Sequence, residues 1–220
     1  MNLHLSLLIL NPGSRQVQAE LRNPYQMHRT LSRAFGTRPE DWKAARVLFR
    51  VEQADGKPSV LIQSRIPPDW SRLTDSTNDY FAKEPATKVL DVDIRTGQLL
   101  RFRLRANPTA KKIVDETIRD CNGRPRRGRV GLFGEQKQME WLRRKAESGG
   151  FKIVECCISA KSDSHSTKAP RTATITHLGV TFDGILIVTN ADLFSQTLAS
   201  GIGSAKGFGF GLLSVAPLAR

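Results

Sequence analysis

The chain has 220 residues and a formal net charge of +13, with 39% hydrophobic and 25% charged residues. This length fits one or two domains, and the apolar content argues against a disordered chain. No apolar run approaches the roughly 18–20 residues of a membrane span, and the run 3–10 lacks the basic leader and cleavage site of a signal peptide, so we expect a soluble cytoplasmic protein. The cationic excess points to a polyanionic partner, most simply a nucleic acid.

The first half of the chain alternates between strand and helix patterns. Apolar residues recur at every second position of 3–10, which predicts a strand. Asn23 and Pro24 are typical of a helix N-terminus, and the apolar stripe that follows them predicts a helix over 24–35. The remaining expected elements are a hairpin with strands near 47–51 and 60–62, a short helix within 70–81, and a strand over 90–94.

The second half follows the same succession more loosely. Apolar residues alternate with Arg101, Arg103 and Arg105, so one face of this strand is apolar and the other is cationic. The elements expected after it are a helix over 135–147, strands over 151–160 and 172–181 joined by a polar loop over 161–171, a strand over 185–188, a helix over 191–199 and a strand over 212–216.

The order of these elements predicts the fold class. The first half gives a strand, a helix, two strands, a short helix and a strand, which is the ferredoxin-like order. We therefore predict an α+β protein of two tandem ferredoxin-like (RRM-like) domains, at 1–94 and 98–220, with a basic inter-domain cleft.

The positive charge is concentrated in the second half. Residues 101–145 contain fourteen Lys and Arg against five Asp and Glu, so nine of the thirteen net charges lie there. The densest part contains Arg124, Arg126, Arg127 and Arg129, and its Gly and Pro predict a loop. Such a loop is either a solvated surface segment or a contact for the nucleic acid.

A glycine-rich segment lies near the C-terminus. Residues 201–211 contain five glycines but match neither the Walker pattern nor GxGxxG, so no nucleotide cofactor is indicated. Successive N–H groups of such a loop can bind an anion, and Lys206 would add a charge for a phosphate. The alternative is a tight helix-to-strand connection without a ligand. The histidines and cysteines lack metal-ligand spacing, so we expect no metal site.

The helix over 24–35 carries the candidate chemistry. Tyr25 and His28 stand three residues apart and project from one face, with Arg29 and Arg33 on an adjacent face. Histidine can take or give a proton at neutral pH, and the positive end of the helix dipole favours an anion. A phosphodiester held by arginines beside a histidine is what a metal-free ribonuclease needs, with Tyr25 orienting the ribose 2′-hydroxyl. A lone histidine on a helix is, however, more often structural.

Three segments of the sequence resemble one family. They are the motif Asn-Pro-Tyr-Gln-Met-His that ends at His28, the segment Leu-Leu-Arg-Phe-Arg-Leu-Arg-Ala-Asn-Pro that ends at Pro108, and residues 201–217. Together they resemble the CasE-type endoribonucleases of the RAMP superfamily, which process CRISPR RNA in the type I-E Cascade complex. The resemblance extends from the first strand to the C-terminus, and the last two segments are the specific ones.

This resemblance implies tandem ferredoxin-like domains and metal-independent cleavage of CRISPR repeat RNA at the 3′ base of its hairpin, which leaves a 2′,3′-cyclic phosphate and a 5′-hydroxyl. It implies catalytic roles for His28 and Tyr25, no cofactor, and the mature crRNA and other Cascade subunits as partners. From the resemblance and from their charge, the residues expected at the RNA are Arg29, Arg33, Arg101, Arg103, Arg105, Arg124, Arg126, Arg127, Arg129, Lys161, Lys168, Arg171, Gly203, Lys206, Gly207 and Gly209.

The sequence leaves three functions to be distinguished. The first is a metal-independent RNA endonuclease with His28 at the cut. The second is a non-catalytic RNA-hairpin scaffold of the same superfamily, in which replacing His28 would have no effect on function. The third is a general basic nucleic-acid binder that would not distinguish a repeat hairpin from a random duplex. The presence of Tyr25, His28 and the glycine-rich segment together favours the first.

Overall fold

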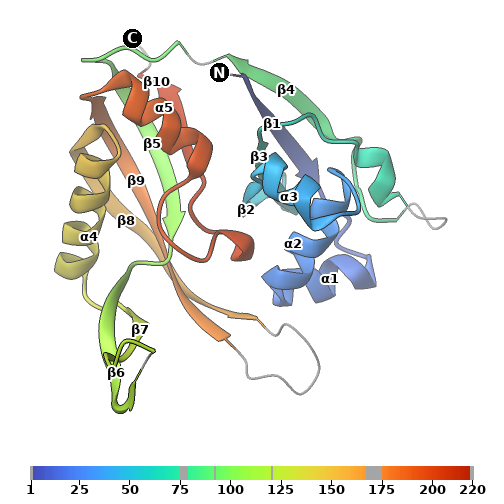
Figure 1. Ribbon diagram of the computed structural model, residues 1–220. Coiled ribbons are helices and arrows are strands. Elements are labelled where there is room, and N and C mark those ends of the chain that lie inside the picture. The colour runs from blue at the N-terminus through green and yellow to red at the C-terminus, as the bar shows by residue number, and fades with distance from the viewer. Residues whose placement is uncertain (1, 75–78, 92, 120, 167–174, 219–220) are drawn as a thin grey trace.

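The computed structural model describes residues 2–74, 79–91, 93–119, 121–166 and 175–218. Two halves stand side by side, each built on a four-stranded antiparallel sheet (Figure 1). Within the described ranges, no helix combines the length and the apolar content that a membrane crossing requires.

The N-terminal half has the strand order of a ferredoxin-like domain. Its sheet runs β2-β3-β1-β4, with every neighbouring pair antiparallel. Its elements are β1 (Asn2–Ile9), α1 (Arg15–Arg22), α2 (Pro24–Arg33), α3 (Pro39–Ala45), β2 (Leu48–Ala54), β3 (Lys57–Ser64), the 3-10 helix η1 (Trp70–Leu73) and β4 (Ala86–Asp91).

The apolar stripe of α2 explains how this helix lies on the sheet. Met27 and Leu31 stand one turn apart and are fully buried, in a core that includes Phe49 of β2. Burial of such a stripe, rather than helix propensity, supplies most of the stability of a short helix. Tyr25 and His28 project beside this buried stripe, where they can face another part of the molecule.

The C-terminal half repeats the topology with an inserted hairpin. Its sheet runs β10-β5-β9-β8, all antiparallel, and β6 pairs only with β7 in a hairpin that projects from the body (Figure 1). Its elements are β5 (Leu99–Ala106), β6 (Thr109–Arg119), β7 (Pro125–Gly131), α4 (Glu135–Ser148), β8 (Phe151–Ser166), β9 (Ile175–Val188), α5 (Ala191–Ser200), the 3-10 helix η2 (Lys206–Phe208) and β10 (Leu213–Pro217).

The fold class expected from the sequence is confirmed. In each half the first strand lies between the third and the fourth, and the second strand is at the edge, which is the ferredoxin-like arrangement. Leu142 of α4 and Phe194 of α5 share one core with Phe182 of β9, so both helices cover the same sheet. A turn at 95–98 connects the two sheets; the domain bounds 1–94 and 98–220 stay a prediction.

Several elements of the N-terminal half differ from expectation. Helices α1 and α3 were not predicted, because each is short and its apolar residues do not form a stripe of two full turns. The helix expected within 70–81 is only the single 3-10 turn η1. The strand expected over 90–94 lies earlier in the chain, as β4 at Ala86–Asp91, and pairs with β1. Val92 lies outside the described residues.

The prediction of a loop over the cluster Arg124–Arg129 is wrong. Residues 125–131 form β7, which pairs antiparallel with β6. Pro125 is the first residue of this strand, a position at which the missing N–H removes no interior ladder bond. Arg126 stands opposite Asp115, so the hairpin also compensates part of its own charge.

The predictions for the long hairpin of β8 and β9 are wrong in two places. Lys161 and the residues up to Ser166 continue β8 instead of forming a loop, while Lys168 and Arg171 lie outside the described residues. The expected break before 185–188 is absent, since β9 runs unbroken from Ile175 to Val188. A Cβ at Gly184 would lie 2.0 Å from the carbonyl oxygen of Glu155, so this glycine permits close strand contact and does not mark a turn.

Polar side chains of β2 and β3 join the two halves. Arg50 is only 4% exposed, and its Nη1 donates to the carbonyl oxygens of Arg103 (3.2 Å) and Leu212 (3.3 Å) in the C-terminal half. Its Nε donates to Oε1 of Glu52 at 2.7 Å. Gln63 donates from Nε2 to the carbonyl oxygen of Leu198 at 2.7 Å. Because a buried guanidinium must be hydrogen-bonded to be tolerated, these contacts fix β2 against the second sheet.

Arg50→Ala is expected to lower the free energy of unfolding by about 2–4 kcal/mol, because two carbonyls and Glu52 lose a charged donor. Arg95→Ala is the matched control, since the Arg95–Asp93 ion pair is exposed (78% and 72%) and its loss should change the free energy of unfolding far less. Denaturant unfolding of both variants at neutral pH measures the difference. Equal effects would show that Arg50 does not hold the halves together.

Candidate functional site at the domain junction

Helix α2 of the N-terminal half faces the glycine-rich loop (residues 201–211) of the C-terminal half. The turn η2 within this loop packs against α2. A Cβ at Gly207 would lie 3.4 Å from Cδ2 and 3.5 Å from Nε2 of His28, and the ring centroids of Tyr25 and Phe208 are 5.9 Å apart. The structure thus brings the predicted pair, Tyr25 and His28, to the predicted loop.

The surroundings of His28 keep its ring neutral. The imidazole is stacked on Phe49, with 6.2 Å between ring centroids and 11° between planes. Burial lowers the pKa of His28 from its ordinary value, because the charged form loses its hydration. The Nδ1 atom is buried and has no hydrogen-bond partner among the described residues. A neutral imidazole that is held by packing on one face is able to accept a proton at neutral pH.

The other polar residues of α2 differ in burial and in their hydrogen-bond partners. Ser32 is fully buried and its hydroxyl donates to the carbonyl oxygen of His28 at 2.7 Å, so this buried hydroxyl has a partner within the helix. Arg29 is exposed beside His28 and donates to Gln26 Oε1 at 3.4 Å. Arg33 is exposed one turn further on and donates to the carbonyl oxygen of Arg72 at 3.3 Å. Of the two predicted arginines, Arg29 is therefore the nearer to His28 along the helix.

The glycine-rich loop is held by contacts with both halves. Lys206 is half-buried, its Nζ donates to the carbonyl oxygen of Ser200 at 2.7 Å, and burial lowers its pKa. Gly209 has φ of 81°, and a Cβ there would lie 3.2 Å from the ring of Phe49, so a side chain would strain the loop at the same ring that supports His28. A Cβ at Gly203 would lie 3.0 Å from Trp141 of α4.

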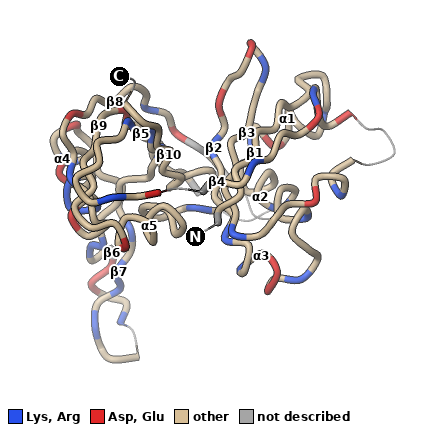
Figure 2. Tube along the Cα trace, turned by 90° about the horizontal axis from the view of Figure 1, so that it is seen from above, with Lys and Arg blue, Asp and Glu red and all other residues tan. Residues whose placement is uncertain are grey.

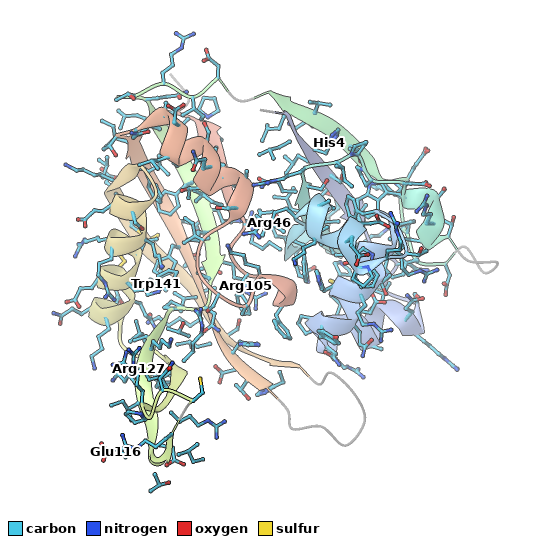
Figure 3. The ribbon with its side chains drawn as sticks, in the orientation of Figure 1. His4, Arg46, Arg105, Glu116, Arg127 and Trp141 are labelled. Atoms are coloured by element: carbon cyan, nitrogen blue, oxygen red, sulfur yellow. The ribbon has the colours of Figure 1, made fainter. Side chains whose placement is uncertain are left out.

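The three predicted arginines of β5 occupy three different environments. Arg105 lies over the ring of Phe210, 5.0 Å from its centroid, and donates to Ser162 Oγ at 3.2 Å; burial lowers its pKa (Figure 3). Arg103 pairs with Asp183 at 2.6 Å. Arg101 is exposed. Only Arg105 contacts the glycine-rich loop, and its backbone oxygen accepts from the N–H of Gly211 at 2.8 Å.

The hollow between the two sheets carries charges of both signs. Arg101 and Arg103 line it together with Glu52 and Asp183, and Arg103 also lies 3.8 Å from Glu52. The two carboxylates compensate much of the positive charge. The predicted inter-domain cleft is therefore less basic than the run of arginines along β5 suggested.

The arginines of the β6–β7 hairpin separate into two groups. Arg129 lines a cavity of about 770 Å³ that Lys206 and Phe208 also line. Arg124, Arg126 and Arg127 line a different hollow, on the hairpin itself. Figures 2 and 3 show the hairpin extending away from the body, with Arg127 on it. Lys161 is exposed on β8.

Sequence reasoning missed three residues beside the candidate pair. His177 of β9 contacts Phe208, with 4.5 Å between ring centroids, and its Nδ1 lies 3.1 Å from Asn107 Nδ2. These residues come from three segments far apart in the chain, so no spacing could reveal them. Two signals were available: Asn107 and Phe208 lie in segments that carry the family resemblance, and His177 lies on a segment predicted to be a strand.

The described residues contain no group of three or more His, Cys, Asp or Glu side chains placed to hold a metal ion. What the junction does provide is a neutral imidazole, a tyrosine and a glycine-rich loop, with cations on both halves. These features define a basic protein of two ferredoxin-like domains with a candidate proton-transfer residue between them.

Comparison with known proteins gives the family. The chain belongs to the family described as "CRISPR associated protein", which matches residues 3–217. It is 36% identical to "CRISPR-associated endoribonuclease Cse3" of Thermus thermophilus (97% of this chain, 99% of the relative) and 35% identical to "CRISPR system Cascade subunit CasE" of Escherichia coli (90% and 94%). The structure of Thermus thermophilus Cse3 bound to an RNA representing a pre-cleavage complex matches with a TM-score of 0.81 at 35% identity (99% of this chain, 100% of that chain).

The lowered pKa of His28 predicts a pH dependence of stability. Below the ordinary pKa of about 6.5 the unfolded chain takes up a proton that the folded chain resists, so the folded state loses stability as the pH falls towards the folded pKa. The free energy of unfolding should therefore fall more steeply between about pH 7.5 and pH 5.5 in the wild type than in His28→Gln. Denaturant titrations at several pH values measure this, and parallel profiles would contradict it.

Proposed function

We propose that this protein is a metal-independent endoribonuclease that cleaves CRISPR repeat RNA at the 3′ base of the repeat hairpin. The observation that carries the proposal is the neutral imidazole of His28, held between Phe49 and Gly207 where the two domains meet. The names of the relatives in Thermus thermophilus and Escherichia coli, an endoribonuclease and a Cascade subunit, support it.

The proposed reaction is an internal transesterification. The ribose 2′-oxygen attacks the adjacent phosphorus, the bond to the 5′-oxygen breaks, and the products carry a 2′,3′-cyclic phosphate and a 5′-hydroxyl. The neutral ring of His28 suits the role of proton acceptor for the 2′-hydroxyl, while the departing 5′-oxygen takes a proton from water. Tyr25 orients the 2′-hydroxyl from the same helix face, so that attack is in line.

Cations near the junction stabilise the charge that develops on the phosphate. Lys206 precedes Gly207 in the loop, and Arg29 follows His28 on the helix. Arg105 supports the same loop through Phe210. Fixed positive groups act more strongly in such a partly buried site than in water.

The hairpin and the long strands extend the RNA surface beyond the cut. Arg126, Arg127 and Arg129 on β7, and Lys161 on β8, hold the backbone of the RNA stem by charge and shape, because the deep groove of A-form RNA is hard to read directly. We propose that the protein stays bound to the mature crRNA as a subunit of a Cascade complex.

The second candidate is a non-catalytic RNA-hairpin scaffold. The hydrogen bond of Lys206 to a backbone oxygen favours it, since this ammonium is then partly engaged within the loop. A scaffold would bind the repeat hairpin without a cut product and would not depend on His28.

His28→Ala is expected to lower single-turnover cleavage of the cognate repeat transcript at least about 100-fold, the lower end of what a lost general acid or base costs. Hairpin affinity should stay within about threefold, since a neutral ring contributes no charge to RNA binding. Gel analysis and filter binding in EDTA measure both.

The ends of the products supply the control for this experiment. Mapping should show a 2′,3′-cyclic phosphate and a 5′-hydroxyl in EDTA. Full loss of wild-type activity in EDTA would reject the metal-independent mechanism, and unchanged cleavage by His28→Ala would reject its role.

Arg127→Ala is expected to weaken binding of the repeat hairpin and to reduce the slope of log affinity against log salt by about one, because one phosphate contact is lost. Arg95→Ala removes a positive charge at the turn between the sheets, far from the hairpin (Figure 1), and should leave the slope unchanged. A change of the same size in both variants would show a general charge effect without a contact at β7.

A further inference from the structure

The 770 Å³ cavity beside the glycine-rich loop shares Lys206 with the proposed cleavage site, but Asn107, His177 and Phe208 in its lining have no part in the proposed bond cleavage. Asn107 and His177 line it from the sheet, Lys206 and Phe208 from the loop, and Arg129 from the β6–β7 hairpin. It therefore lies where the inserted hairpin, the sheet and the loop meet. Its size would accommodate one nucleotide.

Aromatic rings connect this cavity with the candidate catalytic pair. The Phe208 centroid lies 5.9 Å from that of Tyr25 and 4.5 Å from that of His177, and His177 is 5.9 Å from Phe210. Phe208 is thus the shared partner of a residue at the proposed cut and a residue of the cavity. A phosphate beside Tyr25 and a base beside His177 would belong to neighbouring parts of one strand.

The ring of His177 is held in place and uncharged. Asn107 is 6% exposed, and its Nδ2 lies 3.1 Å from His177 Nδ1. Burial lowers the pKa of His177, which favours the neutral ring. The Nε2 atom is buried without a hydrogen-bond partner among the described residues. A fixed, neutral, flat ring is suited to stacking against a nucleobase.

The remaining lining of the cavity selects the class of ligand. Lys206 and Arg129 supply positive charge for a phosphate, whereas the carboxylate of Asp163 can accept a hydrogen bond from a base amino group. The hydroxyls of Thr109 and Ser204, 3.3 Å apart, add polar contacts. Rings, cations and hydrogen-bonding groups in one cavity match a nucleotide better than an apolar ligand or a free anion.

We propose that this cavity binds an unpaired nucleotide that flanks the scissile phosphate, with its base stacked on the rings of Phe208 and His177. The inference rests on the proposed function for the position of the cut. It adds a specificity site: the enzyme would require a base that can leave the stack next to the bond that breaks.

The test measures affinity with RNA that cannot be cut. The parent probe is the cognate repeat hairpin with a 2′-deoxy sugar at the nucleotide preceding the cut. Two further probes each lack the base of one of the two nucleotides that flank the cut. Wild-type protein should bind one of the two abasic probes roughly ten- to hundred-fold more weakly than the parent, the range of a lost base–aromatic stack. Removing an unpaired base farther from the cut is the matched control and should change little.

Variants of His177 separate stacking from folding. His177→Ala should bind the parent probe more weakly and lose its sensitivity to the abasic position, whereas His177→Phe keeps a flat ring and should keep that sensitivity. Crosslinking of unaltered protein to 4-thiouridine at the same nucleotide should label Phe208, His177 or their neighbours, and needs no variant.

The outcomes distinguish this inference from the proposed function. Two results would reject base binding in this cavity even if the all-ribose RNA is cut. One is an affinity that does not change when either flanking base is removed, and the other is a His177→Ala variant whose affinity still falls on that removal as much as in the wild type. Base-dependent binding that His177→Ala removes would support the pocket even if no cleavage occurs.

Discussion

The contact of strand β2 with the C-terminal half is the constraint on which the junction depends. Three consecutive residues of β2 contribute to it. Leu48 lies against the position of Gly201, Phe49 lies between His28 and Gly209, and Arg50 donates to two backbone oxygens of the other sheet. Helix α2 and the glycine-rich loop belong to different halves and pack directly on each other, and the contacts of β2 hold the two halves in that position.

The same contact determines the chemistry that His28 can perform. Packing against Phe49 and the loop removes water from the imidazole and favours its neutral form. Positive charge is nevertheless close, on Lys206 of the loop and on Arg29 of α2, so an anion can approach a ring that is itself uncharged. Arg103 differs, since its charge is paired with Asp183 of its own sheet and also lies 3.8 Å from Glu52 of the N-terminal half.

Local patterns predicted much of the fold, and in the candidate site they singled out Tyr25, His28 and the glycine-rich loop. The apolar stripe of α2 and the alternation of β1 and β5 depend on residues that are near neighbours in the sequence. The three-residue spacing on the predicted helix placed Tyr25 and His28 on one face. Strand β7 was mistaken for a loop because its pairing with β6 is not visible in its own composition. The pairing of Arg103 with Asp183 and the contact of His177 with Phe208 join residues far apart in the chain, so no local pattern could predict them.

In the proposed reaction the ring of His28 lies at the bond that is broken. The most direct measurement is a crystal structure of the unaltered protein bound to its repeat hairpin with a 2′-deoxy sugar before the cut. We expect a ring nitrogen of His28 within about 2.6–3.2 Å of an oxygen of the scissile linkage. A scissile phosphate seated in the hollow beside Arg101 and Arg103, with His28 still covered by the loop, would contradict it.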